Sequence, residues 1–328
     1  MKSSALALSC LLILAAGTAS PRAAPERTVS VADNLRPAAF VNRPVGPKQP
    51  IAAYALGEPV YLYVILANWS RTETFSMSGA WHPANDLEIT ITPPKDLPRR
   101  FTAGAQGKMF PTSVTKIGPR DMTVYRVPLV YEPATASGFA FDQPGRYTIT
   151  TRMTLMVNDV PQTAGFPKVE LTILPASPKV HEALDLFMRP ECAEDLQRGY
   201  ARAETAATWQ ELIERYPGSG WAPHAKILLA WRAWRDSAED YTAIAKRFEA
   251  ILAEHRAFLT RASFADEAYY GCVSALDRAG KPLEALEWIR RLQREFPNSH
   301  YIRGGSALLQ KYIQKQDDNL YAPWFLSE

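Results

Sequence analysis

The apolar positions between residues 51 and 175 follow a period of two, which is typical of β-strands. Proline, glycine and Asn-Asp turn signals separate the apolar runs, and no useful helical period interrupts them. The pattern predicts about seven short strands that form an antiparallel β-sandwich. The run at 60–66 is apolar at almost every position, so we expect both faces of that strand to be covered. The alternating runs are 60–66, 87–91, 125–131, 147–157 and 169–173.

After about residue 176 the apolar period changes to 3.6, which is typical of amphipathic helices. Tyr241, Ile244, Phe248 and Ile251 lie on one such stripe, and proline and glycine separate it from its neighbours. We therefore predict two domains, an all-β domain over 51–175 and an all-α domain over 176–328. The other helical stripes cover 209–216, 264–276 and 285–296.

The helical half repeats itself at an offset of 80 residues. The sequence Glu-Leu-Ile-Glu-Arg-Tyr-Pro-Gly-Ser at 211–219 matches Arg-Leu-Gln-Arg-Glu-Phe-Pro-Asn-Ser at 291–299, and Cys192 falls on Cys272. Self-similarity at a fixed offset predicts stacked helical hairpins. The match pairs Tyr216 with Phe296, Pro217 with Pro297 and Ser219 with Ser299.

The stretch from Ala268 through Gly280 to Ala285, followed by the turn at 296–299, resembles a tetratricopeptide repeat. It is similar to the variant found in periplasmic and outer-membrane assembly proteins, where an aromatic-Pro-x-Ser turn ends each hairpin. The resemblance implies small packing positions at Ala268, Gly280 and Ala285. The unit at 240–265 departs from this pattern because it lacks the glycine and proline signals. Stacked hairpins leave a groove, so the resemblance also implies a peptide or protein partner.

Two motifs of the β region point to a fold family. Asp142-Gln143-Pro144-Gly145-Arg146-Tyr147 looks like a tyrosine corner, in which Tyr147 bonds back to nearby backbone. Gly-Glu-Pro-Val-Tyr-Leu at 57–62 is similar to the opening strand of bacterial immunoglobulin-like modules. The resemblance implies an immunoglobulin-like sandwich, and such motifs imply a fold rather than an activity. The Cys…Trp…Cys core of antibody domains is absent.

The N-terminus has the pattern of a secretory signal peptide over residues 1–19. A basic start precedes an apolar run of ~12 residues, which is too short to span a membrane. Small residues at 17–19 predict cleavage near Ala19; Ala24, an uncleaved anchor and lipidation at Cys10 are the alternatives. We expect a periplasmic or extracellular protein with no transmembrane segment in the mature chain. Residues 20–50 are rich in proline and predict an irregular linker or arm.

The composition excludes several classes of protein. The 328 residues include 37 basic and 34 acidic side chains, a balance that argues against a dedicated nucleic-acid binder. Cys192 and Cys272 occupy equivalent repeat positions two hairpins apart, so we do not expect a disulfide between them. No histidine has metal-ligand spacing and no catalytic motif is present, so we expect no catalytic residue, metal or cofactor. We expect His224 and His300, which follow the helix-ending turns, to be solvated.

The charged pairs Glu194-Asp195, Lys246-Arg247 and Arg290-Arg291 are interpreted as solvated faces. Asn68-Trp69-Ser70 matches the pattern of an N-glycosylation acceptor, which is short and frequent. Trp69 and Trp81 are expected to take core or semi-buried packing positions in the β domain. The apolar C-terminal segment at 320–326 is either a cap on the last hairpin or a partner motif.

These observations favour an exported, non-catalytic protein-interaction or assembly factor of the bacterial cell envelope. It would bind a peptide or protein through the helical groove, and an envelope complex is one setting for such a partner. One alternative is a secreted hydrolase or protease-inhibitor-like protein that acts through the long 93–120 loop. Another is carbohydrate binding through Trp69 and Trp81, which requires both rings to be exposed.

Overall fold

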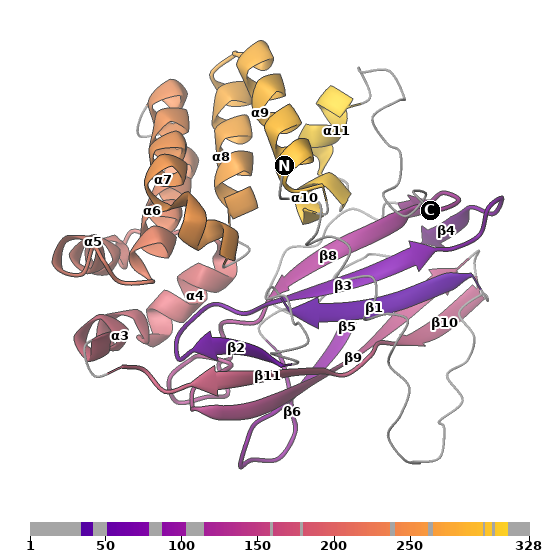
Figure 1. Cartoon of the computed structure of the whole chain (residues 1–328), viewed down its shortest axis with the longest axis horizontal. Coiled ribbons are helices and arrows are strands. Elements are labelled where there is room, and N and C mark those ends of the chain that lie inside the picture. The colour runs from indigo at the N-terminus through magenta and orange to yellow at the C-terminus, as the bar shows by residue number, and fades with distance from the viewer. Residues whose placement is uncertain are drawn as a thin grey trace.

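The computed structural model describes residues 34–41, 51–78, 87–102, 115–157, 160–177, 180–236, 240–261, 265–297, 299–303 and 306–313. Within these ranges the N-terminal region is rich in strands and the C-terminal region is helical (Figure 1). The strands are β1 (Leu35–Val41), β2 (Ala52–Ala55), β3 (Tyr61–Asn68), β4 (Phe75–Ser78), β5 (Leu87–Thr92), β6 (Arg99–Arg100), β7 (Thr115–Ile117), β8 (Met122–Pro128), β9 (Gly145–Val157), β10 (Val160–Gly165) and β11 (Val169–Leu174).

The strands form two sheets that share one core. One sheet has the order β1-β3-β8, and the other has the order β2-β11-β9-β4-β7, with β5 and β10 also paired to β9. Leu62, Val64 and Leu66 of the first sheet are buried in the same cluster as Ile149 and Leu171 of the second. The strand pairs are antiparallel apart from β2 with β11, which run parallel. This pair corrects the purely antiparallel prediction.

The predicted proline-rich arm at 20–50 contains a strand. Leu35–Val41 pairs with β3 from Leu35 opposite Asn68 to Val41 opposite Leu62. The prediction of irregular backbone was wrong there, because Leu35 and Val41 bury their side chains in the sheet core. Pro37 is tolerated because β1 is an edge strand, where a missing N–H need not break a ladder. The signal peptide at 1–19 lies outside the described residues.

The predicted 93–120 loop is also more regular than expected in its described parts. Arg99–Arg100 pairs with β5, and Thr115–Ile117 pairs with β4. Neither segment has enough alternating residues to be recognised from the sequence alone. The two short strands attach both ends of the loop to the larger sheet.

Strand β3 is covered on both faces, as its continuous apolar run predicts. Leu62 and Val64 face the core between the sheets. Tyr61 and Tyr63 point to the other side and are buried with residues of the helical region. The three-stranded sheet is therefore a middle layer between the second sheet and the helices (Figure 1).

The helices end at positions that repeat with the offset seen in the sequence. The helices Pro190–Arg198 and Ala265–Arg278 end 80 residues apart. The helices that follow them, Ala206–Arg215 and Pro282–Glu295, also end 80 residues apart. No helix in the described ranges is both long and apolar enough to cross a membrane. The helices are α3 (His181–Phe187), α4 (Pro190–Arg198), α5 (Ala206–Arg215), α6 (Ala222–Asp236), α7 (Tyr241–Arg261), α8 (Ala265–Arg278), α9 (Pro282–Glu295), α10 (His300–Arg303) and α11 (Ala307–Ile313).

The helices share buried clusters with the sheet. Met122 and Val124 of β8 are buried with residues of α6 to α11, and Val130 and Phe139 are buried with residues of α3 to α6. In addition, Gln197 Oε1 accepts from the backbone N–H of Val130 at 3.2 Å. The change from strands to helices near residue 175 therefore does not separate two independent cores.

Candidate functional site

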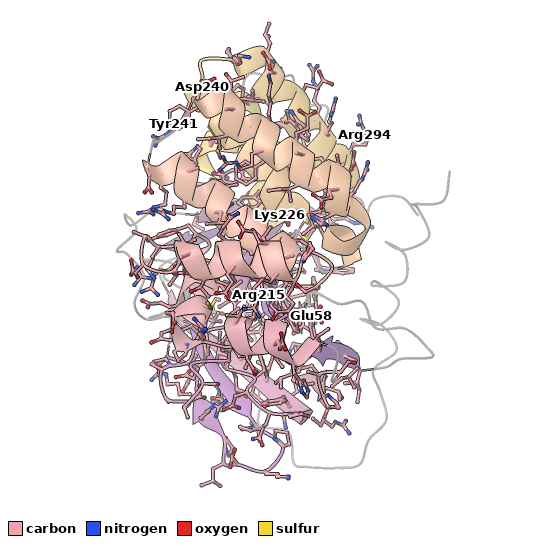
Figure 2. All side chains as sticks on the ribbon, turned by 90° about the vertical axis from the view of Figure 1, so that its left-hand side faces the viewer. Glu58, Arg215, Lys226, Asp240, Tyr241 and Arg294 are labelled. Atoms are coloured by element: carbon pink, nitrogen blue, oxygen red, sulfur yellow. The ribbon has the colours of Figure 1, made fainter. Side chains whose placement is uncertain are left out.

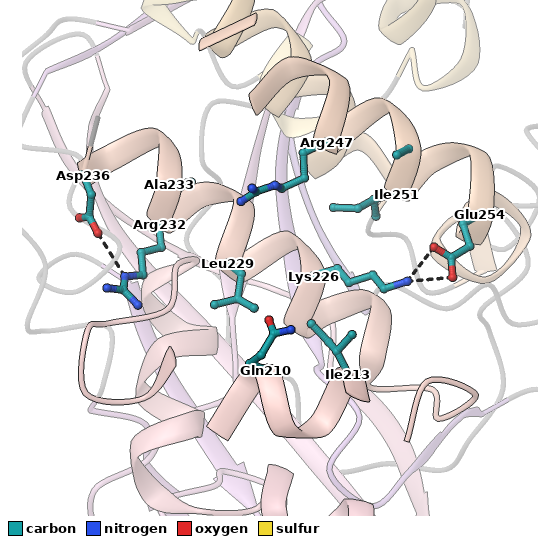
Figure 3. A pocket seen from close by; sticks show the side chains of 11 residues that line it. Gln210, Ile213, Lys226, Leu229, Arg232, Ala233, Asp236, Arg247, Ile251 and Glu254 are labelled. Atoms are coloured by element: carbon teal, nitrogen blue, oxygen red, sulfur yellow. Dashed lines mark hydrogen bonds and ion pairs between the residues drawn. The ribbon is translucent and has the colours of Figure 1, made fainter. Parts of the chain in front are cut away.

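Two hollows flank helix α7 on the surface of the helical region. The first has a volume of about 530 Å³ and lies among α5, α6 and α7 (Figure 3). The second has a volume of about 400 Å³ and lies among α7, α8 and α9. Figure 2 looks onto this side of the helices, with Lys226 on α6 and Arg294 on α9 labelled. The first hollow is lined by Gln210, Ile213, Lys226, Leu229, Arg232, Ala233, Asp236, Arg247, Ala250, Ile251 and Glu254.

The helical period of α7 explains why it lines both hollows. Ile244, Phe248 and Leu252 bury one face of the helix in the core. Ala250 and Ala253 lie on the exposed face, one in each hollow. Because alanine has no side chain beyond Cβ, α7 forms a low ridge and leaves space on both flanks.

The first hollow has a charged wall. Lys226 Nζ donates to both carboxylate oxygens of Glu254, at 2.8 and 2.7 Å, and lies 2.9 Å from His255 Nε2. The hydrogen bond from Lys226 lowers the pKa of Glu254. Burial and then the Lys226 charge lower the pKa of His255, which favours a neutral ring that accepts at Nε2. On the far side of the hollow, Arg232 Nε donates to Asp236 Oδ2 at 3.1 Å (Figure 3).

The second hollow combines an aromatic floor with ion pairs. Tyr269 and Trp288 meet edge to face with ring centroids 5.4 Å apart. Arg256 Nη2 donates to Glu295 Oε2 at 2.6 Å, and the Tyr269 hydroxyl donates to the same oxygen at 2.5 Å. Burial and the Glu295 carboxylate raise the pKa of Tyr269 to about 12, so the phenol stays a donor. Both hollows thus offer apolar floors with polar rims.

A buried ionic cluster joins the three-stranded sheet to the helices. Arg126 of β8 forms an ion pair with Glu267 of α8 and lies 3.8 Å from Asp266. Its guanidinium carbon is 4.9 Å from the Tyr61 ring centroid and 5.6 Å from that of Tyr301. Burial by itself would lower the pKa of Arg126, but Glu267 and other neighbours raise it well above its usual value. The arginine therefore stays charged inside the interface.

Asp266 connects this cluster to the turn after α9. Ser299 Oγ donates to Asp266 Oδ2 at 2.7 Å, and His300 Nδ1 lies 3.5 Å from the same oxygen. Burial alone would raise the pKa of Asp266, but His300 and Arg126 outweigh it, so the pKa is lowered. Sequence reasoning missed the cluster because its members come from β3, β8, α8 and α10 without a local motif. It lies outside both hollows, so we interpret it as a positioning element.

The tyrosine-corner residues build a turn of the β region. The Tyr147 hydroxyl donates to the carbonyl of Gln143 at 3.0 Å, the backbone contact expected of such a corner. Gly145 has φ +140°, and a Cβ there would lie 2.4 Å from Pro94 Cγ, so the site requires glycine. Asp142 Oδ1 lies 3.8 Å from Arg99 Nη2.

The predicted turn residues of the helical region form two similar turns. The backbone N–H of Ser219 donates to Tyr216 O at 2.9 Å, and Ser299 donates to Phe296 O at the same distance. The ψ values of Tyr216 and Phe296 are 52° and 60°. Gly280 ends α8 at φ +70°, and Pro217 and Pro297 follow the aromatic residue of each turn. None of these residues lines a hollow, so they shape the hairpins and do not form the candidate site.

Cys192 and Cys272 are both free and buried, and they belong to different clusters. Burial is the main cause of the raised pKa of each thiol. The pKa of Cys192 is raised to about 12. Neither is therefore a reactive thiolate at neutral pH.

Three residues predicted to be solvated are not. His224 is 1% exposed, and burial lowers its pKa to about 4. The His300 side chain is 18% exposed and packs on Tyr301 with ring centroids 3.9 Å apart. Asp195 is buried and accepts from Trp209 Nε1 at 2.7 Å. The predictions failed because helix packing buries His224 and Asp195 and leaves His300 only partly exposed.

The other candidate residues offer no built site among the described ranges. Trp69 is 49% exposed and is not a core residue, and the Arg120 guanidinium carbon lies 5.9 Å from its ring centroid. Trp81 lies outside the described residues. Asn68 is 1% exposed and its amide donates to the carbonyls of Glu73, Ile117 and Gly118, which leaves no room for a glycan. No group of three or more His, Cys, Asp or Glu in the described ranges could hold a metal ion. The segments at 103–114 and 320–326 lie outside these ranges.

Comparison with known proteins assigns no family. No protein-family model matches the chain, and no curated protein matches it. An alkylpurine DNA glycosylase from Pseudomonas fluorescens, AlkC bound to DNA with an abasic-site analogue, is 14% identical over 43% of this chain, with a TM-score of 0.23. This chain spans 30% of the glycosylase's length. A PapD-like domain of human CEP192 is 11% identical over 49% of this chain and 95% of its own, with a TM-score of 0.24. Neither similarity supports a fold or an activity at such scores.

Proposed function

We propose that this chain is an exported, non-catalytic adaptor or assembly factor of the bacterial cell envelope. It holds a peptide or protein segment across helix α7, with one part of the segment in each hollow. The observation that carries the proposal is the pair of adjacent hollows on either side of one exposed helix.

The chemistry of the hollows suits a peptide. Ile213, Leu229 and Ile251 give the first hollow an apolar floor, and Leu252 and Trp288 do so in the second. Their charged and amide-bearing rims can bond to the backbone and polar side chains of an extended segment. Such a mixture of apolar centre and polar rim is typical of protein interfaces.

The fold is part of the proposal. We infer that the helices are tetratricopeptide-like hairpins, supported by the equal offsets of the helix ends and by the two matching aromatic-Pro-x-Ser turns. We infer that the β region is an immunoglobulin-like sandwich, supported by the two-sheet core and the Tyr147 contact. In this arrangement the sheet supports the hairpins from behind and leaves the α7 side open.

The proposal is tested by site-specific photo-cross-linking in a bacterial envelope extract. A benzophenone amino acid replaces Ala250 in the hollow or, as a control, the 85% exposed Leu97 of the β region. We expect discrete adducts from position 250 that are absent from position 97. The added substitution Ala253→Arg, which fills the second hollow, should reduce the adducts, whereas Ala207→Arg on an exposed position of α5 should not. Equal adducts from both positions, or none from position 250, would contradict the proposal.

A further inference from the structure

The carboxylates on α7 and α9 are mostly neutralised within the chain. Four of them form ion pairs with described residues, which leaves Glu249 without one. The four pairs are Glu254 with Lys226, Glu284 with Lys281, Glu287 with Arg291, and Glu295 with Arg256.

Several cations of the same two helices have no such partner. Lys246, Arg290 and Arg294 form no ion pair with any residue that the structure describes. Arg294 lines the second hollow. Lys246 lies one helical turn before Glu249 and Ala250, and Arg290 lies one turn before Arg294, so both belong to the same exposed stripes. Three cations without an ion pair thus lie at exposed positions of α7 and α9, one of them in the second hollow, against one such carboxylate.

We propose that the segment held across α7 is acidic. Its Asp or Glu side chains meet Lys246, Arg290 and Arg294, while its apolar side chains rest on the floors of the hollows. This inference rests on the proposed function and adds the chemistry of the partner. A charged rim of this kind increases the association rate and selects among partners more than it adds affinity.

A peptide fits the face better than a nucleic acid does. Glu249, which has no ion pair among the described residues, lines the second hollow. A continuous line of phosphates would pass close to this carboxylate, whereas a peptide can place single acidic side chains away from it. The apolar floors also require side chains to cover them.

The test compares two fluorescein-labelled peptides by anisotropy with the chain from residue 20 onward. Both contain four repeats, Leu-Ser-Glu in one and Leu-Ser-Lys in the other. We expect the acidic probe to bind and the basic probe not to bind, with affinity that falls as salt rises. The double variant Lys246→Glu/Arg294→Glu should weaken the acidic probe by about tenfold. The matched double variant Lys116→Glu/Lys168→Glu, at exposed positions of the β region, should leave binding unchanged.

The outcomes separate this inference from the proposed function. If both probes bind equally and Ala250→Arg abolishes both, the face accepts peptides of any charge, and the acidic inference is overturned while the function stands. If Lys116→Glu/Lys168→Glu weakens binding as much as Lys246→Glu/Arg294→Glu does, the acidic probe responds to the overall charge of the protein and not to the α7 face. The inference then also fails. Absence of binding by the acidic probe would overturn it as well, and cross-linking from position 250 then decides the proposed function independently.

Discussion

Asp195 illustrates at the residue scale how the helical region holds a buried charge. Its carboxylate accepts from Arg202 Nε at 2.6 Å and Trp209 Nε1 at 2.7 Å, and also from the Thr205 hydroxyl. These bonds fix the loop between α4 and α5 against both helices. A sequence pair such as Glu194-Asp195 suggests two solvated acids, but Asp195 faces inward because its partners come from the following loop and from α5.

Replacing Asp195 with alanine should destabilise the protein by about 2–4 kcal/mol, because it leaves Trp209, Thr205 and Arg202 without their acceptor. Urea unfolding monitored by circular dichroism measures the change. Asp185→Ala, at an exposed position of α3, is the control and should cost less than about 0.5 kcal/mol. Equal effects of the two substitutions would show that the buried network contributes nothing.

His224 makes stability dependent on pH. Its pKa is about 4 in the folded protein, because burial disfavours the charged ring, against an ordinary value of 6.5. The unfolded chain therefore binds more protons between these values, and stability falls as pH drops from 6.5 towards 4. At pH 5 the expected loss is about 2 kcal/mol relative to pH 7.

Urea unfolding at pH 7, 6 and 5 tests this dependence. The substitution His224→Gln should make the curve shallower over that range, while the lowered pKa values of His255 and His300 keep part of the slope, and His181→Gln, at an exposed position of α3, should leave the slope unchanged. A wild-type curve that is already flat between pH 7 and 5 would contradict the assignment.

At the scale of elements, the turns are the features that the sequence predicts best. Tyr216 and Phe296 end their helices with nearly the same backbone angles, and Ser219 and Ser299 bond back in the same way. These interactions span only three or four residues, so local sequence specifies them. The strands β6 and β7 are too short to carry such a signal, and their pairing partners decide their conformation.

Two glycines provide a matched test of turn geometry. Gly145 and Gly199 both have positive φ, but a Cβ at Gly145 would collide with Pro94, whereas a Cβ at Gly199 meets nothing within 4 Å. We expect Gly199→Ala to cost about 1 kcal/mol from backbone strain alone. Gly145→Ala should cost at least about 2 kcal/mol more because of the collision. Thermal and urea unfolding measure both, and equal costs would mean that the Pro94 contact relaxes freely.

At the scale of the whole molecule, the sheet β1-β3-β8 is shared by two cores, and Arg126 lies where it meets the helices. Tyr61 and Tyr63 are buried on the helix side of this sheet. The burial of each side chain contributes on the order of 1.5–3 kcal/mol to the stability of the fold. The ion pairs of Arg126 add little net stability but fix which part of the sheet faces which helix. The α7 face is then held away from the sheet and stays open.

Removing Arg126 tests this arrangement. Arg126→Met should destabilise the protein by about 3–5 kcal/mol, because Asp266 and Glu267 lose their cation inside the interface. Adding Glu267→Gln should restore part of that loss, so the two substitutions are not additive. The exposed pair Arg146 and Glu170 is the control, and the same substitutions there should cost less than about 1 kcal/mol. Additive effects at Arg126 and Glu267 would contradict a coupled buried pair.

The sequence by itself determined where strands give way to helices, where the matched helices end and which turns repeat, because periodicity and capping act over a few residues. It also indicated that β3 is covered on both sides. Only the tertiary structure decided what covers it, which charges are buried and where the hollows lie. Arg126 and Glu267 are 141 residues apart, and the hollows exist only between hairpins, so packing rather than local sequence places them.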